Sequence, residues 1–194
     1  MTFEKLFPQQ KRMRKMTGLL SFYQRSGLQT VARKTKLLAV LPSQLQSMEK
    51  ILPDAPSYKT MKSRPTHLKA IGETKKKVAF FTGCLMDTMF LTTNEATTKL
   101  LQLAGCEIFI PESQACCGAL HGHSGEKAQA KALAKRNIEA FEQLDVDTII
   151  TNAGGCGAFL YDYAHLLKDE AEWVERRSEE RRVGKECRSR WSPY

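Results

Sequence analysis

Four cysteines in the middle of the chain could bind a soft metal centre. Cys116 and Cys117 are adjacent and are followed at once by Gly118, while Cys84 and Cys156 stand alone. A disulfide between neighbouring residues would close a strained ring, so we do not expect Cys116 and Cys117 to pair with each other. Zinc and iron–sulfur clusters both accept thiolate ligands, because sulfur is a soft donor. These side chains therefore predict a metal or redox site rather than a structural crosslink.

The rest of the sequence is consistent with a reducing compartment. The chain has 194 residues and six cysteines, and its first residues lack the apolar segment of a secretory signal. No stretch approaches the roughly 20 consecutive apolar residues that span a bilayer. We therefore expect a cytoplasmic protein, in which cysteines serve metal binding or redox chemistry more often than disulfides.

The net charge of +9 is unevenly distributed along the chain. Residues 1–77 hold 17 Lys and Arg against 4 acidic residues, whereas residues 78–176 hold 7 against 14. The basic part could attract phosphates, but it has no RNA-binding or helix-turn-helix signature and few aromatic residues among its charges. We therefore expect no nucleic-acid partner, and the part that carries the four cysteines is acidic.

The pattern of apolar residues divides the chain into three parts. Residues 1–52 show helix-like apolar spacing in short pieces, and residues 53–77 are rich in Pro and Lys, which is typical of an extended linker. We expect a basic helical segment and linker at 1–77, followed by one domain at 78–176. Residues 177–194 have no apolar period and resemble the translation of a sequencing adapter, so we interpret them as a non-native tail.

Strands and helices alternate within the second part. Strands separated by helices of this length imply a parallel sheet with flanking helices, an α/β fold of the Rossmann-like kind. The apolar runs predict strands at 78–83, 106–111 and 146–152, the last followed by a glycine-rich turn. The segments between them predict helices at 92–104, ending at Gly105, at 124–145 with Ser124 as N-cap, and at 158–174.

This topology would gather the four thiols. Cys84 follows the first predicted strand, the Cys116–Cys117 pair follows the second, and Cys156 follows the third. The carboxyl ends of parallel strands lie at one edge of a sheet, where binding sites form, so we expect these four side chains to converge. Cys106 opens the second strand at its amino end, and we expect it to be a small buried apolar residue outside the site.

The residues favour a multi-iron cluster over a single zinc ion. Structural zinc sites usually take closely spaced C-x2-4-C pairs, whereas adjacent cysteines point in different directions and suit a larger body. Gly118, Gly154, Gly155 and Gly157 would let the backbone approach such a cluster. A zinc-stabilised interaction module stays open as an alternative. So does a thiol–disulfide redox protein, in which a helix N-terminus would stabilise the Cys117 thiolate.

Other polar side chains near the cysteines have simpler interpretations. His121 and His123 could ligate metal or relay a proton, but such histidines more often cap a helix or face solvent. Tyr161, Asp162 and Tyr163 fit ordinary half-buried packing on a helix. We assign none of these five a catalytic role.

The cysteines and their flanking residues resemble a known family. Cys84 and Cys116 are separated by 31 residues, and Cys117 and Cys156 by 38. Together with the stretches "GCLMD", "ACCGALHGH", "RNIEAF" and "NAGGCGAFLYDYAHLLKDE", this pattern resembles the cysteine-rich CCG domain, most closely that of the iron-sulfur subunit of glycolate oxidase. The basic helical part resembles the connection between modules in that subunit.

The resemblance implies an electron-transfer role. It suggests that Cys84, Cys116, Cys117 and Cys156 hold an iron–sulfur cluster, and that electrons from 2-hydroxy-acid oxidation on a flavoprotein partner pass through it toward a quinone or similar acceptor. It also implies possible peripheral membrane association through that complex. The subunit itself would turn over no substrate.

The sequence departs from the family pattern in two respects. It lacks the ferredoxin-like motifs expected upstream and the second CCG repeat expected downstream, so we expect a fragment. Ala153 stands where five-cysteine members carry another Cys, so their larger double cluster does not carry over. A single [4Fe-4S] cluster with one Cys per iron matches the four ligands.

Overall fold

The computed structural model describes residues 9–35, 37–40 and 42–176. The segment at 177–194, predicted to be a non-native tail, lies outside the described residues. Within the described part, no helix is long and apolar enough to cross a membrane.

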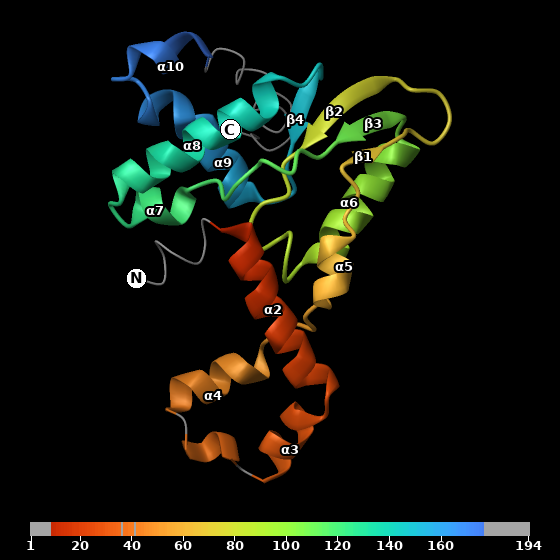
Figure 1. The fold of residues 1–194 in the computed structure, drawn as a ribbon, viewed down its shortest axis with the longest axis vertical. Helices are drawn as coiled ribbons and strands as arrows, with labels where there is room; N and C mark the ends of the chain where they lie inside the picture. Colours follow the sequence, from red (N-terminus) through yellow and green to blue (C-terminus); the bar gives the residue numbers. More distant parts are fainter. Residues whose placement is uncertain (1–8, 36, 41, 177–194) are drawn as a thin grey trace, which may run out of the picture.

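Short helices make up the basic first part, as its apolar spacing predicts. They form an arm that extends away from the sheet in Figure 1. A buried face of α2 with Met13, Thr17 and Ser21 packs toward the rest of the protein, and α2 contacts both α3 and α5. The elements are α2 (Gln10–Arg25), α3 (Leu28–Lys34), the 3-10 helix η1 (Leu37–Val40) and α4 (Ser43–Lys50).

The segment predicted as an extended linker has structure of its own. It contains the helix α5 (Tyr58–Lys62), where the Ser57 side chain accepts a hydrogen bond from the backbone N–H of Thr60. It then forms the two-residue strand β1 (His67–Leu68), which pairs with the main sheet. The sheet therefore includes residues on both sides of the boundary expected near residue 77, and that boundary stays a prediction.

A four-stranded mixed sheet forms the centre of the second part. Its order is β1-β3-β2-β4. The three strands expected from the apolar runs are present and parallel, in the positions β2 (Lys76–Phe80), β3 (Cys106–Phe109) and β4 (Thr148–Ile150). The sequence did not predict that β1 would join the edge of β3 in the antiparallel direction. The sheet is therefore mixed rather than purely parallel.

Helices cover both faces of this sheet. On one face, Ala79 and Phe81 pack in a buried cluster with residues of α8 and α9. On the other face, Val78 and Phe80 pack with Ile108 and with Leu101 of α6. A strand buried on both faces reads as a continuous apolar run, which explains the stretch from Val78 to Phe81. The helices are α6 (Leu91–Leu103), α7 (Ala119–His123), α8 (Lys127–Glu142), α9 (Gly154–Leu166) and α10 (Ala171–Arg176).

Three predicted helix boundaries are wrong. The helix predicted at 158–174 is two helices, because α9 ends at Leu166 and α10 begins at Ala171. Ser124 is not the N-cap of the long helix, because it is the C-cap residue of the short helix α7, and α8 begins only at Lys127. The glycine-rich stretch before residue 158 is not a turn, because α9 already begins at Gly154. The prediction that the helix after the first long strand ends at Gly105 is confirmed: α6 ends just before it, and Gly105 has a φ of +87°.

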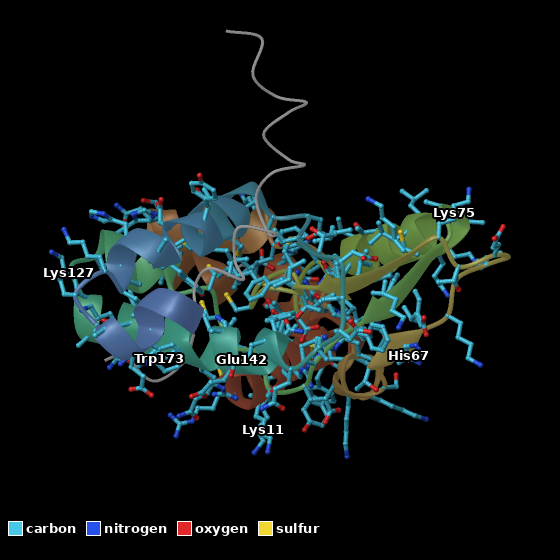
Figure 2. The ribbon with its side chains drawn as sticks, turned by 90° about the horizontal axis from the view of Figure 1, so that it is seen from above. Lys11, His67, Lys75, Lys127, Glu142 and Trp173 are labelled. Atoms are coloured by element: carbon cyan, nitrogen blue, oxygen red, sulfur yellow. The ribbon has the colours of Figure 1, made fainter. Side chains whose placement is uncertain are left out.

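The parallel strands give the sheet two distinct edges. Figure 2 shows Lys127, at the start of α8, and Lys75, just before β2, at opposite ends of the molecule. Because β2, β3 and β4 are parallel, all three begin at one edge of the sheet and end at the other. The segments that follow the strands therefore share one edge, and Cys84, Cys116, Cys117 and Cys156 lie in those segments.

Candidate functional site

Three segments bring the four thiols to the carboxyl edge of the sheet. Cys84 lies in the loop after β2, Cys116 and Cys117 lie between β3 and α7, and Cys156 lies in the first turn of α9 after β4. Gly83, in the first of these loops, has a φ of +69°, and a Cβ placed there would stand 3.7 Å from the Sγ of Cys156. The convergence predicted from the shared carboxyl edge of parallel strands is therefore present in the fold.

Each thiol of the four contacts its neighbour along this edge. The Sγ of Cys116 lies 3.5 Å from the Sγ of Cys84. Cys117 interacts with Cys116 on one side and with Cys156 on the other. All cysteines of the described part are free thiols. Within that part, no three Cys, His, Asp or Glu side chains are arranged to hold a single metal ion. The four sulfurs form one contiguous group.

Burial and mutual contact shift the pKa values of these thiols. The hydrogen bond with Cys116, and then burial, raise the pKa of Cys84 far above its ordinary value. The pKa of Cys116 is raised to about 11, mainly by its hydrogen bond with Cys117. For Cys117 the hydrogen bond with Cys116 lowers the pKa, but the contact with Cys156 and burial raise it by more, to about 12. The pKa of Cys156 is lowered by its hydrogen bond with Cys117.

These shifts argue against a nucleophilic thiol at Cys117. A reactive cysteine needs an exposed side chain with a lowered pKa, whereas Cys117 is only 4% exposed and its pKa is raised. The helix that follows, α7, has only five residues. The low exposure of Cys117 and its short following helix give no support to the thiol–disulfide alternative, which depends on a stabilised thiolate at this position.

Cys106 lies away from the group. It opens β3 at the amino edge of the sheet and packs, partly buried, against the cluster that contains Val78 and Ile108. Its place outside the thiol group agrees with the sequence analysis, although its burial is only partial.

A buried amide and a buried phenol hold the backbone of the cysteine pair. The Oδ1 of Asn137, on α8, accepts from the backbone N–H of Ala115 at 2.7 Å, and its Nδ2 donates to the backbone carbonyl of Cys116 at 2.9 Å. The hydroxyl of Tyr163, on α9, donates to the carbonyl of Cys117 at 2.6 Å and accepts from Asn137 Nδ2 at 2.9 Å. Both side chains are at most 1% exposed.

This clamp was not identified from the sequence. Half-buried packing was expected for Tyr163, and this is wrong for the buried residue, whereas Tyr161 and Asp162 on the same helix are exposed. Asn137 belongs to the stretch "RNIEAF", but nothing local to that stretch indicates its partners. A polar residue on the apolar face of a predicted helix was the one signal that could have marked it, because buried amides need hydrogen-bond partners.

A second set of amides fixes the end of β2. Gln114 accepts from the backbone N–H of Thr82 at 2.9 Å and donates to the carbonyl of Pro111, also at 2.9 Å. Asn94 donates to the carbonyl of Thr82 at 3.0 Å and accepts from Asn152 at 2.8 Å. These bonds join the segments that lead to Cys84, to the cysteine pair and to Cys156.

The two histidines lie beside the site in different environments. His121 is fully buried on α7, and its Nε2 stands 3.9 Å from a carboxylate oxygen of Glu126. His123 is exposed, and its ring packs edge-on against Phe159 at a centroid distance of 5.7 Å. The expectation of a helix cap or solvent exposure is thus met by His123 and wrong for His121.

Two family models match parts of the chain. Residues 78–161 match the family described as the cysteine-rich domain, CCG. Residues 1–52 match the family described as the linker region of the glycolate oxidase iron-sulfur subunit. No solved structure matches the chain.

Two bacterial relatives show the extent of the similarity. A probable glycolate oxidase iron-sulfur subunit of Bacillus subtilis is 67% identical over 174 residues, which are 90% of this chain and 39% of that protein. Lactate utilization protein A of an Exiguobacterium species is 41% identical over 99 residues, covering 51% of this chain and 40% of that protein. The chain thus spans about two fifths of the length of these relatives. Residues 78–161 of the chain belong to the CCG cysteine-rich domain family.

Proposed function

We propose that this chain forms part of an iron–sulfur subunit that conducts electrons in a complex oxidising 2-hydroxy acids of the glycolate type. The observation that carries the proposal is the contiguous group of four thiols at one edge of the sheet. The similarity to an iron-sulfur subunit over nine tenths of the chain supports it. In this role the chain carries electrons and has no substrate of its own.

The residues present fit an iron–sulfur cluster. Soft thiolate ligands favour iron–sulfur clusters and zinc over harder metal centres, and four cysteines provide one ligand for each iron of a [4Fe-4S] cluster. When bound, the cluster would supply one-electron transfer. Cys84, Cys116, Cys117 and Cys156 would hold it, and the low exposure of the first three would keep water from their sulfurs.

The start of α9 offers further donors to such a cluster. The first backbone N–H groups of a helix have no partner within the helix, and Ala153 provides no side-chain cap. Gly154 and Gly155 are exposed, and a Cβ at either position would meet no atom within 4 Å. The exposed backbone beside Cys156 would bring a partner's redox centre close to the cluster. This supports the start of α9 as the place where electrons enter or leave.

The wider setting is part of the same proposal. The partner would be a flavoprotein that oxidises the hydroxy acid, the acceptor a quinone or a similar molecule, and the location the cytoplasm, with peripheral membrane association through the complex. The parallel part of the sheet, β2, β3 and β4, would be a Rossmann-like core. The boundary of the cluster domain would fall near residue 77, where the matched family begins.

Metal analysis separates this function from a zinc-stabilised interaction module. The full chain is reconstituted with iron and sulfide under anaerobic conditions, and its metals and acid-labile sulfide are measured. We expect a brown protein with about four iron and four sulfide per chain, whose visible absorption falls on reduction. A colourless protein that retains zinc and no sulfide would contradict the proposal.

A further inference from the structure

Three charged side chains from distant parts of the chain meet in the interior. The Nη2 of Arg14 lies 2.7 Å from Oδ2 of Asp87, and the Nε of Arg64 lies 3.3 Å from Oδ1 of the same carboxylate. The side chain of Asp87 is 1% exposed, that of Arg64 is 9% exposed and that of Arg14 is 19% exposed. This is a buried group of one acid between two guanidinium ions.

The three residues come from different elements. Arg14 lies on α2, in the basic helical arm, 73 residues before its partner. Arg64 lies between α5 and β1. Asp87 lies in the loop that follows Cys84. The group therefore joins the arm and the segment before the sheet to the first cysteine loop.

Hydrogen bonds within the loop connect the residues around Asp87 to Cys84. Thr88, the next residue, donates its hydroxyl hydrogen bond to the backbone carbonyl of Cys84 at 3.0 Å and also lies 3.2 Å from that of Leu85. The backbone N–H groups of Thr88 and Met89 donate to the carbonyl of Leu85. This tight turn ties residues 84–89 together, so that a displacement of Asp87 moves Cys84.

Burial makes the contact depend on both charges. A buried carboxylate that loses its positive partners is strongly unfavourable, and two guanidinium groups left without the carboxylate are equally so. In Arg64, burial lowers the pKa and Asp87 opposes that shift. The loop conformation observed here is therefore the one in which Asp87 reaches both arginines.

We propose that Asp87 is a positioning residue for Cys84, fixed by Arg14 and Arg64, so that the basic helical arm is a structural part of the thiol site. The effect on the thiol follows from the contacts above, and its importance for electron transfer rests on the proposed function. The arm then does more than connect modules: it sets the geometry of one of the four ligands.

Labelling of the individual cysteines tests this in the apo form of the full chain. Wild type and Asp87→Asn are treated with iodoacetamide, and the modification of each cysteine is followed by mass spectrometry. We expect Cys84 to react at least about tenfold faster in the variant, the change produced by about 1.4 kcal/mol of lost local stability. The rates of Cys116 and Cys117, whose backbone carbonyls Asn137 and Tyr163 hold, should change much less.

Matched variants separate positioning from a general loss of stability. Arg33→Gln removes one positive charge from an ion pair with Glu49 in the same arm, away from the cysteine loop, and should leave the Cys84 rate unchanged. Arg14→Gln, whose ion pair is partly exposed, should raise the Cys84 rate by a smaller factor. In the double variant Arg14→Gln, Asp87→Asn, the Cys84 labelling rate should rise by less than the product of the two single-variant factors, because the residues act as one unit.

A spectroscopic measurement extends the test to the loaded protein. Asp87→Asn should alter the EPR signature of the reconstituted, reduced cluster, whereas Arg33→Gln should not. An unchanged Cys84 labelling rate in Asp87→Asn, or equal acceleration at Cys84, Cys116 and Cys117, would overturn the proposal. If wild type forms no cluster at all, the proposed function fails, but the labelling experiment still decides the role of Asp87.

Discussion

At the scale of single residues, the site depends on polar side chains that hold the backbone of the cysteines. The Asn137–Tyr163 clamp satisfies the carbonyls of both adjacent cysteines, which lie in a loop and have no strand partner. Buried carbonyls without donors are costly, so these two side chains allow the pair to remain in the interior. The thiol side chains are thereby left available to face the common edge.

Removal of the Tyr163 hydroxyl should loosen this clamp. Tyr163→Phe leaves the Cys117 carbonyl without its donor, and we expect a loss of about 1–3 kcal/mol in the free energy of unfolding of the apo protein. Urea denaturation followed by circular dichroism measures it. Tyr58→Phe, at an exposed position of α5 away from the cysteines, is the control and should change stability little. Equal stabilities for the two variants would refute the role of the clamp.

Gly118 should tolerate no side chain. Its φ is +89°, and a Cβ there would stand 3.3 Å from the ring of Phe159 and 3.4 Å from the carbonyl oxygen of Ala130. Gly125 has a similar φ of +83° but open space around the same position. The left-handed conformation costs each alanine variant about 1–2 kcal/mol, so the contacts should make Gly118→Ala the less stable of the two in urea denaturation. A smaller loss for Gly118→Ala than for Gly125→Ala would show that the site can relax.

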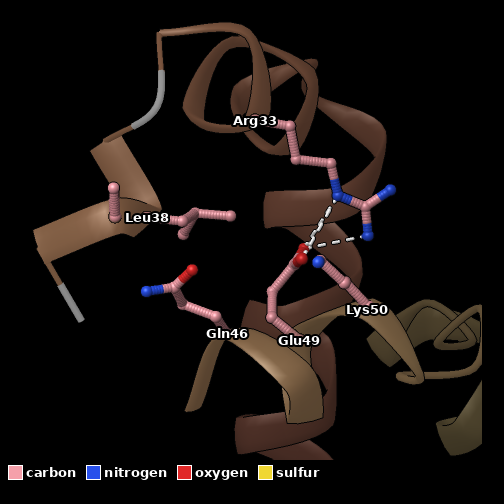
Figure 3. A pocket seen from close by; sticks show the side chains of 6 residues that line it. Arg33, Leu38, Gln46, Glu49 and Lys50 are labelled. Carbon is pink, nitrogen blue, oxygen red and sulfur yellow. Dashed lines mark hydrogen bonds and ion pairs between the residues drawn. The ribbon is translucent and has the colours of Figure 1, made fainter. Parts of the chain in front are cut away.

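At the scale of elements, the arm is stabilised by its own ion pair. Figure 3 shows Arg33 of α3 directed toward Glu49 of α4, with dashed lines for their hydrogen bonds. Gln29 also donates to Glu49 at 2.8 Å. The hydrogen bond from Gln29, and then that from Arg33, lower the pKa of Glu49. The carboxylate is thus stabilised in its charged form by the fold.

This lowered pKa predicts an acid-sensitive contribution to stability. Because the folded pKa lies below the unfolded one, the contribution is complete above the unfolded value of about 4.3 and is lost as the pH falls through the folded value. Glu49→Gln should therefore have a lower melting temperature than wild type at pH 7 and the same melting temperature in acid. The loss at pH 7 should be below about 1 kcal/mol in the free energy of unfolding. Glu139→Gln, at an exposed position of α8, is the control. A Glu49→Gln effect that persists unchanged in acid would contradict this account.

The elements show how far the sequence can specify the fold. Apolar runs predicted β2, β3 and β4 and their parallel order, because strands buried on both faces have a local signature. The strand β1 has only two residues in a segment rich in Pro and Lys, and it exists through its pairing with β3. The short helix α7 was not predicted, because it has only five residues and its C-cap residue, Ser124, was interpreted as the start of the next helix.

At the scale of the whole molecule, the site is a product of the topology. The four thiols come from three strand ends and span 73 positions of the chain, yet they form one group because parallel strands end at one edge. The alternation of strands and helices, which implies parallel strands, made this predictable from the sequence. The supports of the site, Asn137, Tyr163, Asp87 and its arginines, were not predictable, because each acts through a partner far along the chain.

The most direct test of the account is the iron and labile sulfide content of five cysteine variants after anaerobic reconstitution. Cys84→Ser, Cys116→Ser, Cys117→Ser and Cys156→Ser should each retain much less iron and sulfide than wild type, because each removes one of four ligands. Cys106→Ser, at the other edge of the sheet, should retain as much as wild type. Wild-type iron and sulfide in all four site variants, or an equal loss in Cys106→Ser, would contradict the central claim.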